Sequence, residues 1–122
     1  MTQEWLKAFH EGDAEALSAL FAKDAVYISF TSPFPVVGRE EIRAAFAGFI
    51  RTFPIRQLLL RDEFRKAYGD TVIYNCNWTF VYGDGKGPIK TVYGRTSSAN
   101  AVVEGKRLLL LMATSSLPVA GP

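Results

Sequence analysis

Hydrophobic and polar residues alternate most clearly between residues 71 and 82. The even positions of this stretch are apolar or aromatic and the odd ones mostly polar; the even set is Val72, Tyr74, Cys76, Trp78, Phe80 and Tyr82. A period of two, in a stretch rich in β-branched and aromatic residues, predicts a β-strand with one buried face. That face needs an apolar cover, which the helices predicted earlier in the chain can supply.

Three helices are predicted before this strand. Thr2 can act as the N-cap of the first, and Asp13 as the N-cap of a second over residues 14–22. The third covers residues 39–52. Their apolar faces follow from spacings of three and four residues and comprise Trp5, Leu6 and Phe9; Leu17, Leu20 and Phe21; and Ile42, Phe46, Phe49 and Ile50.

Four further strands are predicted, over residues 25–30, 55–68, 89–103 and 107–116. Glycine-rich turns separate the last of these, so the strands from residue 55 onward should pair antiparallel with their neighbours. Helices followed by consecutive antiparallel strands predict an α+β fold in which the sheet curls around the helices.

Length and composition fit a single domain over residues 1–122, with 48% hydrophobic and 21% charged residues. The net charge of +2, with no run of like charges, does not favour nucleic acid or an acidic membrane as a partner. One cysteine and one histidine allow neither an intramolecular disulfide nor a typical metal site, and no cofactor is expected. Without a signal-peptide pattern or a membrane-spanning apolar run, we expect a cytoplasmic protein.

The chain contains, in this order, Gly12-Asp13, the run 17–26, Val37-Gly38-Arg39-Glu40-Glu41-Ile42 with Phe46, Gly94-Arg95-Thr96-Ser97, Glu104-Gly105-Lys106 and Ser115-Ser116-Leu117-Pro118. In order and spacing these motifs resemble the nuclear transport factor 2-like superfamily, including its SnoaL-like branch. The resemblance implies a cone-shaped, cystatin-like half-barrel with three N-terminal helices on the concave face of a curved, mostly antiparallel sheet. It also implies a homodimer through the outer face and a deep pocket between sheet and helices.

Strand and helix periodicity predict which side chains line such a pocket. The expected ligand-binding residues are Trp5, Phe9, Ser29, Phe49, Trp78, Phe80, Arg95, Ser97, Met112 and Thr114. Arg95 and Ser97 are included because the odd positions of the strand over residues 89–103 are expected to face inward. An apolar, aromatic cavity with a few hydroxyls and one guanidinium suits a small hydrophobic molecule that carries a polar or anionic group.

The candidate catalytic residues are Asp62, Arg95 and Tyr27. A buried guanidinium must be paired, and Asp62 is the acidic residue that strand parity places inward. Asp62 and Arg95 therefore form an internal ion pair, or Arg95 faces a ligand. An unpaired Asp62 in an apolar pocket would have a raised pKa and could act as a general acid or base.

The residues do not fit the chemistry of ketosteroid isomerases, which needs a carboxylate base and a tyrosine plus a protonated aspartate as hydrogen-bond donors. The corresponding positions here hold Ser29 for the base, and Trp5 and Ser97 for the donors. The last strand also carries Arg107 and Thr114, where many relatives have an aromatic residue and a histidine.

Three functions remain open. The first, which the residues favour, is a small-molecule binding domain of the SnoaL-like type. The second is a cofactor-independent lyase, isomerase or hydrolase acting on a small hydrophobic substrate with Asp62, Arg95 or Tyr27. The third is a structural dimer module whose cavity is filled by its own side chains.

Overall fold

A computed structural model describes residues 1–118 of the chain. Helices occupy the N-terminal part and strands the C-terminal part, with one short hairpin between the second and third helices. The elements are α1 (Thr2–Glu11), α2 (Ala14–Ala19), β1 (Phe21–Ile28), β2 (Val36–Val37), α3 (Arg39–Thr52), β3 (Ile55–Tyr68), β4 (Thr71–Gly83), β5 (Lys90–Val103) and β6 (Lys106–Ser116).

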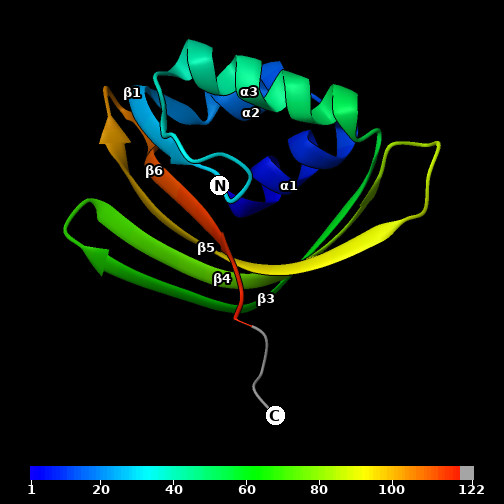
Figure 1. The fold of residues 1–122 in the computed structure, drawn as a ribbon. Helices are drawn as coiled ribbons and strands as arrows, with labels where there is room; N and C mark the ends of the chain where they lie inside the picture. The colour runs from blue at the N-terminus through cyan, green and yellow to red at the C-terminus, as the bar shows by residue number, and fades with distance from the viewer. Residues whose placement is uncertain (119–122) are drawn as a thin grey trace.

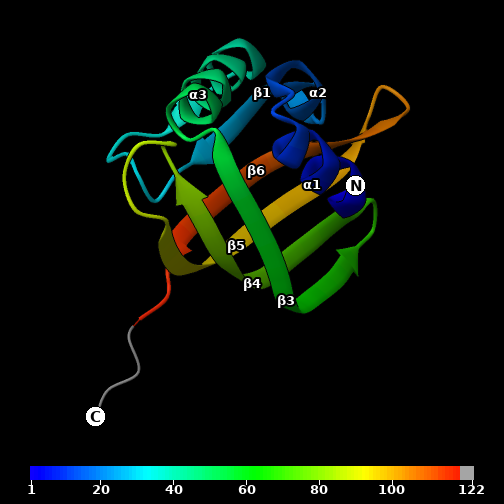
Figure 2. The same ribbon diagram turned by 90° about the vertical axis from the view of Figure 1, so that its right-hand side faces the viewer.

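The strands form one sheet in the spatial order β2-β1-β6-β5-β4-β3. Neighbouring strands are antiparallel except β1 and β6, which run parallel. The sheet is strongly curved, and the helices lie across its concave face (Figures 1 and 2). The predicted α+β fold with a mostly antiparallel sheet is therefore confirmed.

The third helix has the predicted bounds, residues 39–52. Ile42 and Phe46 lie one turn apart and are 0% and 3% exposed, so α3 is fully covered at these two positions. It packs against α2 and β1. The bounds of β3 also match the prediction, and those of β4, β5 and β6 differ by one residue at one end each.

The second helix is shorter than predicted. It ends at Ala19, and β1 begins at Phe21 rather than at residue 25. Phe21 is completely buried, and the carbonyl of Leu20 accepts a 2.8 Å hydrogen bond from the amide of Leu109 in β6. Short apolar runs fit a helix face and a buried strand equally well, and here pairing with a strand almost ninety residues away decides the structure.

Asp13 caps α2 as predicted, because its Oδ1 accepts a 3.0 Å hydrogen bond from the amide of Ala16. The predicted cap at Thr2 is wrong. The N-cap position of α1 is Met1, without a side-chain hydrogen bond, and Thr2 lies inside the helix. Its hydroxyl instead accepts a hydrogen bond from Arg65 on β3.

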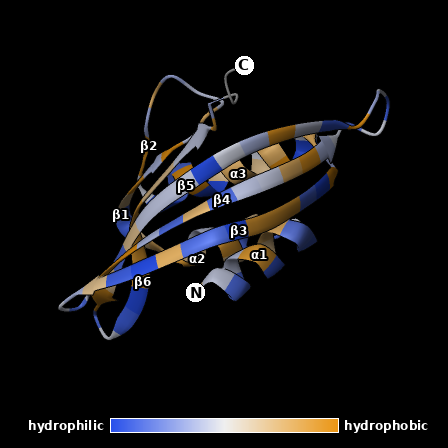
Figure 3. Ribbon diagram, turned by 90° about the horizontal axis from the view of Figure 1, so that it is seen from below, coloured by the Kyte–Doolittle hydropathy of each residue, from blue (hydrophilic) through white to orange (hydrophobic). Residues whose placement is uncertain are grey.

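The outer face of the sheet carries hydrophilic and hydrophobic positions side by side along β3, β4 and β5 (Figure 3). Among residues 1–118, no helix is long and apolar enough to cross a membrane.

Candidate functional site

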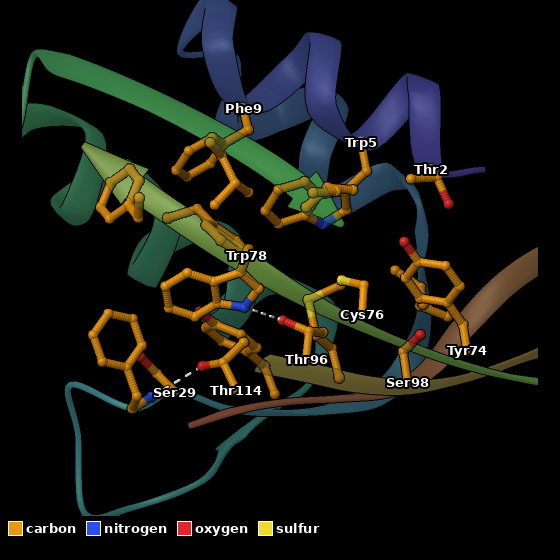
Figure 4. Close-up of a pocket in the computed structure, with 18 of the residues that line it drawn as sticks. Thr2, Trp5, Phe9, Ser29, Tyr74, Cys76, Trp78, Thr96, Ser98 and Thr114 are labelled. Carbon is orange, nitrogen blue, oxygen red and sulfur yellow. Dashed lines mark hydrogen bonds between the residues drawn. The ribbon is translucent and has the colours of Figure 1, made fainter. Parts of the chain in front are cut away.

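A cavity of about 290 Å³ lies between the concave face of the sheet and the helices α1 and α3. Figure 4 shows its construction: Trp5 and Phe9 descend from α1 towards Trp78, while Cys76 and Thr96 rise from β4 and β5. Helical spacing and strand alternation therefore point two sets of side chains into the same space.

Most of the residues predicted to form the pocket do line this cavity. They are Trp5, Phe9, Tyr27, Ser29, Phe49, Trp78, Phe80, Met112 and Thr114. On β4 the alternation behaves as the sequence predicts, with Tyr74, Cys76, Trp78 and Phe80 all buried. That these side chains contact a ligand remains a prediction.

The predicted inward position of Arg95 and Ser97 is wrong. In β5 the even positions face the cavity, because Gly94, Thr96 and Ser98 are the cross-strand partners of Trp78, Cys76 and Tyr74. Cross-strand partners share a face of the sheet. Arg95 therefore points outward and donates a hydrogen bond from Nε to Ser115, while Ser97 donates one to Asn75 on the same outer face.

Asp62 is also outside the cavity. The pairing of β3 with β4 shifts between Arg61 and Phe64, and Asp62 has a positive φ of 55° at this bulge. An extra residue in one strand reverses the inward and outward positions that follow it. Asp62 consequently accepts a hydrogen bond from Asn77 on the outer face, and the ion pairs among residues 1–118 do not include an Asp62–Arg95 pair.

The same bulge brings Glu63 and Arg65 to the concave side, which strand parity could not show. Arg65 lines the cavity, and its guanidinium carbon lies 4.7 Å from the centre of the Tyr74 ring. Its Nη2 donates to Thr2 Oγ1 at 3.0 Å and to Glu63 Oε2 at 3.3 Å. Arg65 is the only charged side chain among the lining residues from positions 1–118.

Aromatic rings form most of the cavity wall near the helices. Trp5 stacks on Phe9 at 5.1 Å between ring centres, and Phe9 contacts Phe80 at 5.7 Å. The indole nitrogen of Trp78 donates a 2.9 Å hydrogen bond to Thr96. The indole nitrogen of Trp5 is buried and has no hydrogen-bond partner within residues 1–118, which is unusual for a buried polar group.

Burial favours the neutral form of three titratable side chains that line the cavity, Tyr27, Tyr74 and Cys76. Burial raises the pKa of Tyr27, and hydrogen bonds with Ser29 and Thr114 offset part of this increase. Burial also raises the pKa of Tyr74, with a further increase from its hydrogen bond to Glu63. Burial likewise raises the pKa of Cys76. All three groups are therefore protonated near pH 7, and the thiol of Cys76 is a poor nucleophile.

The cavity can therefore enclose an apolar molecule and offer it neutral hydroxyl groups and one guanidinium. The lining residues within positions 1–118 include no carboxylate and no imidazole. General acid–base catalysis most often uses these two groups.

Comparison with known proteins agrees with this architecture. The sequence model of the SnoaL-like domain family matches residues 2–105. The chain belongs to the SnoaL-like domain family. No curated protein sequence matches this SnoaL-like domain.

Solved structures show the same fold at low sequence identity. A nuclear transport factor 2-like superfamily protein from Salmonella enterica serovar Typhimurium is 18% identical, with a TM-score of 0.88 over 98% of this chain and 88% of that one. A protein of unknown function with a cystatin-like fold from Nostoc punctiforme is 19% identical, with a TM-score of 0.78 over 96% and 86%. A ketosteroid isomerase-like protein from Erwinia carotovora atroseptica is 15% identical, with a TM-score of 0.80 over 97% and 92%.

Proposed function

We propose that this SnoaL-like domain binds a small, largely apolar molecule that carries one polar or anionic group. The observation that supports this most directly is the cavity of about 290 Å³. Protein interiors rarely contain voids larger than a water molecule, and ligand pockets begin at about 300 Å³. The third alternative, a cavity filled by its own side chains, is therefore the least consistent with the structure.

Arg65 is the group expected to meet the polar end of the molecule. Both hydrogen bonds that its side chain makes within residues 1–118 use Nη2. A guanidinium has five N–H donors, so those on Nε and Nη1 remain available to a ligand. Trp5 and Phe9 would cover the apolar part, since they line the cavity from the helix side.

The catalytic alternative has less support. Asp62 and Arg95, which would have carried it, both make their hydrogen bonds on the outer face. Tyr27 does line the cavity, but its raised pKa makes it a hydrogen-bond donor rather than a base near neutral pH.

The test is a thermal-shift screen with small neutral terpenoid ketones and alcohols and with small aromatic acids. A ligand at one hundred times its dissociation constant should add about 2.7 kcal/mol of stability. Ala45 on α3 lines the cavity, whereas its neighbour Ala44 is exposed. Ala45→Leu should therefore fill the space and abolish the shift, and Ala44→Leu should preserve it. Equal shifts in both variants would place binding outside the cavity.

We also propose that a second copy of the chain covers the outer face of the sheet. Large apolar side chains are exposed there, namely Leu59, Phe64, Ile73, Tyr93 and Leu111. Ile73 and Leu111 both pair with Ala99, so they form one apolar row across three strands. Sedimentation of the wild type should give a dimer, and Tyr93→Glu should give a monomer. A wild-type monomer at tens of micromolar would contradict this proposal.

A further inference from the structure

One end of the cavity contains a pair of opposite charges. Arg65 lines the cavity, and its Nη2 lies 3.3 Å from Oε2 of Glu63. The same Glu63 oxygen accepts a 2.7 Å hydrogen bond from the hydroxyl of Tyr74, which also lines the cavity. The Glu63 carboxylate thus contacts two lining residues without lining the cavity itself, and the side chains of Arg65 and Glu63 are 53% and 40% exposed.

This arrangement affects what Arg65 can bind. A lone guanidinium at the edge of an apolar cavity would attract a carboxylate, because paired charge-assisted hydrogen bonds are strong. Glu63 already supplies that negative charge. A ligand carboxylate placed at Arg65 would therefore meet a like charge a few ångströms away, and it would have to lose water without gaining a free cation.

A neutral acceptor does not meet this penalty. A ketone, amide or alcohol oxygen can accept from the free Nε or Nη1 donors while the Glu63–Arg65 pair stays intact. Thr2, which accepts from Arg65, and Tyr74, which donates to Glu63, carry neutral hydroxyls. The electrostatics of this end of the cavity therefore favour an uncharged polar group.

We propose that Glu63 determines the charge of the ligand: by neutralising Arg65 it makes the cavity select molecules with an uncharged hydrogen-bonding end and reject carboxylic acids. This inference rests on the proposed binding function and narrows its "polar or anionic" group to a neutral one. Glu63 acts through Arg65 and Tyr74, so it is a specificity-determining residue rather than a direct ligand contact.

The neighbouring residue Asp62 provides a matched control. It carries the same charge one position earlier on β3, but it accepts its hydrogen bond from Asn77 on the outer face. Asparagine tolerates the positive φ of this position about as well as aspartate does. Glu63→Gln and Asp62→Asn therefore remove one negative charge each, on opposite faces of the sheet. Glutamine at position 63 can still accept the hydrogen bond from Tyr74.

The experiment measures binding of 2-naphthamide and 2-naphthoic acid, which have nearly the same shape and differ in charge at pH 7.5, by calorimetry. The wild type and Asp62→Asn should bind the amide about two- to fivefold more tightly than the acid, the range expected for one exposed charge contact. Glu63→Gln should remove or reverse this preference. Arg65→Gln, a second variant that leaves Glu63 in place, should weaken acid binding further.

The outcomes separate the two proposals. Equal or tighter binding of the acid by the wild type would overturn the role of Glu63 while leaving a binding cavity in place. The same conclusion would follow if Asp62→Asn changed the preference as much as Glu63→Gln. Failure of every variant to bind either compound, or any compound of the thermal-shift panel, would remove the binding function and this inference with it.

Discussion

The backbone of Gly94 on β5 lies directly against the indole ring of Trp78 on β4. The two residues are cross-strand partners, and a Cβ atom added at Gly94 would overlap the ring carbons Cζ2 and Cη2 of Trp78. Trp78 is 4% exposed and forms part of the cavity wall, so the missing side chain at position 94 determines how the ring can lie.

Gly94→Ala should therefore destabilise the fold. Inserting a methyl group into a well-packed site costs about 1–3 kcal/mol, and urea denaturation should show this loss at an unchanged m-value. Gly48→Ala is the control, because a Cβ on this α3 residue would meet only Arg51 at 3.8 Å. An alanine in a helix should instead stabilise by about 0.5–1 kcal/mol. If Trp78→Phe cost as much stability in the Gly94→Ala background as in the wild type, overlap with the ring would not be the cause.

The hydrogen bond from Trp78 to Thr96 gives a second prediction. Thr96→Val has nearly the same shape but leaves the buried indole N–H without its acceptor at 2.9 Å. An unsatisfied buried donor costs about 1–3 kcal/mol, so the midpoint of urea denaturation should fall. Thr91→Val, at an exposed position of the same strand, should change stability by less than about 0.5 kcal/mol. Equal losses in both variants would indicate a general effect of valine in β5.

The sequence was sufficient to predict the elements whose periodicity is long and clear. The stripe of Ile42 and Phe46 defines α3, and the alternation from Tyr74 to Phe80 defines both β4 and its inward face. In such elements the residues that are apolar are also those that pack in the core, so local pattern and tertiary structure agree.

The pattern of hydrophobic and polar residues was insufficient where pairing with other strands decides which side chains face the cavity. The even positions of β5 hold Gly94, Thr96 and Ser98, which look like surface residues although all three are buried. The glycine opposite a tryptophan was the available signal, because a large ring often covers a glycine in the neighbouring strand. The bulge at Asp62 has no comparable signal in the sequence. Because of this bulge, the charged residue that lines the cavity is Arg65 and not Asp62.

The helix caps give a third prediction. Asp13→Ala should cost about 1 kcal/mol, because the carboxylate that accepts from the Ala16 amide is lost. Thr2→Ala should cost less than about 0.5 kcal/mol, since Thr2 caps no helix and its bond to Arg65 is exposed. Thermal denaturation of both variants beside the wild type measures the difference. A larger loss for Thr2→Ala than for Asp13→Ala would contradict this assignment of the caps.

Alkaline pH should destabilise the protein through Tyr74. Burial and the hydrogen bond to Glu63 raise the pKa of Tyr74 above its unfolded value near 10. Below pH 10 the phenol is protonated in both states, so its full contribution to stability is present. As the pH rises above 10, the unfolded state loses this proton first, and the free energy of unfolding falls.

Melting temperatures at pH 9, 10 and 11 test this sign. The wild type should lose stability more steeply above pH 10 than Tyr74→Phe, which cannot ionise at this position. Tyr68→Phe is the matched control, because Tyr68 lies on β3 with 60% of its surface exposed, and folding leaves its ring largely in water. Tyr68→Phe should follow the wild-type slope. If the melting temperature of Tyr74→Phe fell as steeply with pH as that of the wild type, other groups would cause the loss of stability at alkaline pH. The buried Tyr27 would then be the first of these groups to replace.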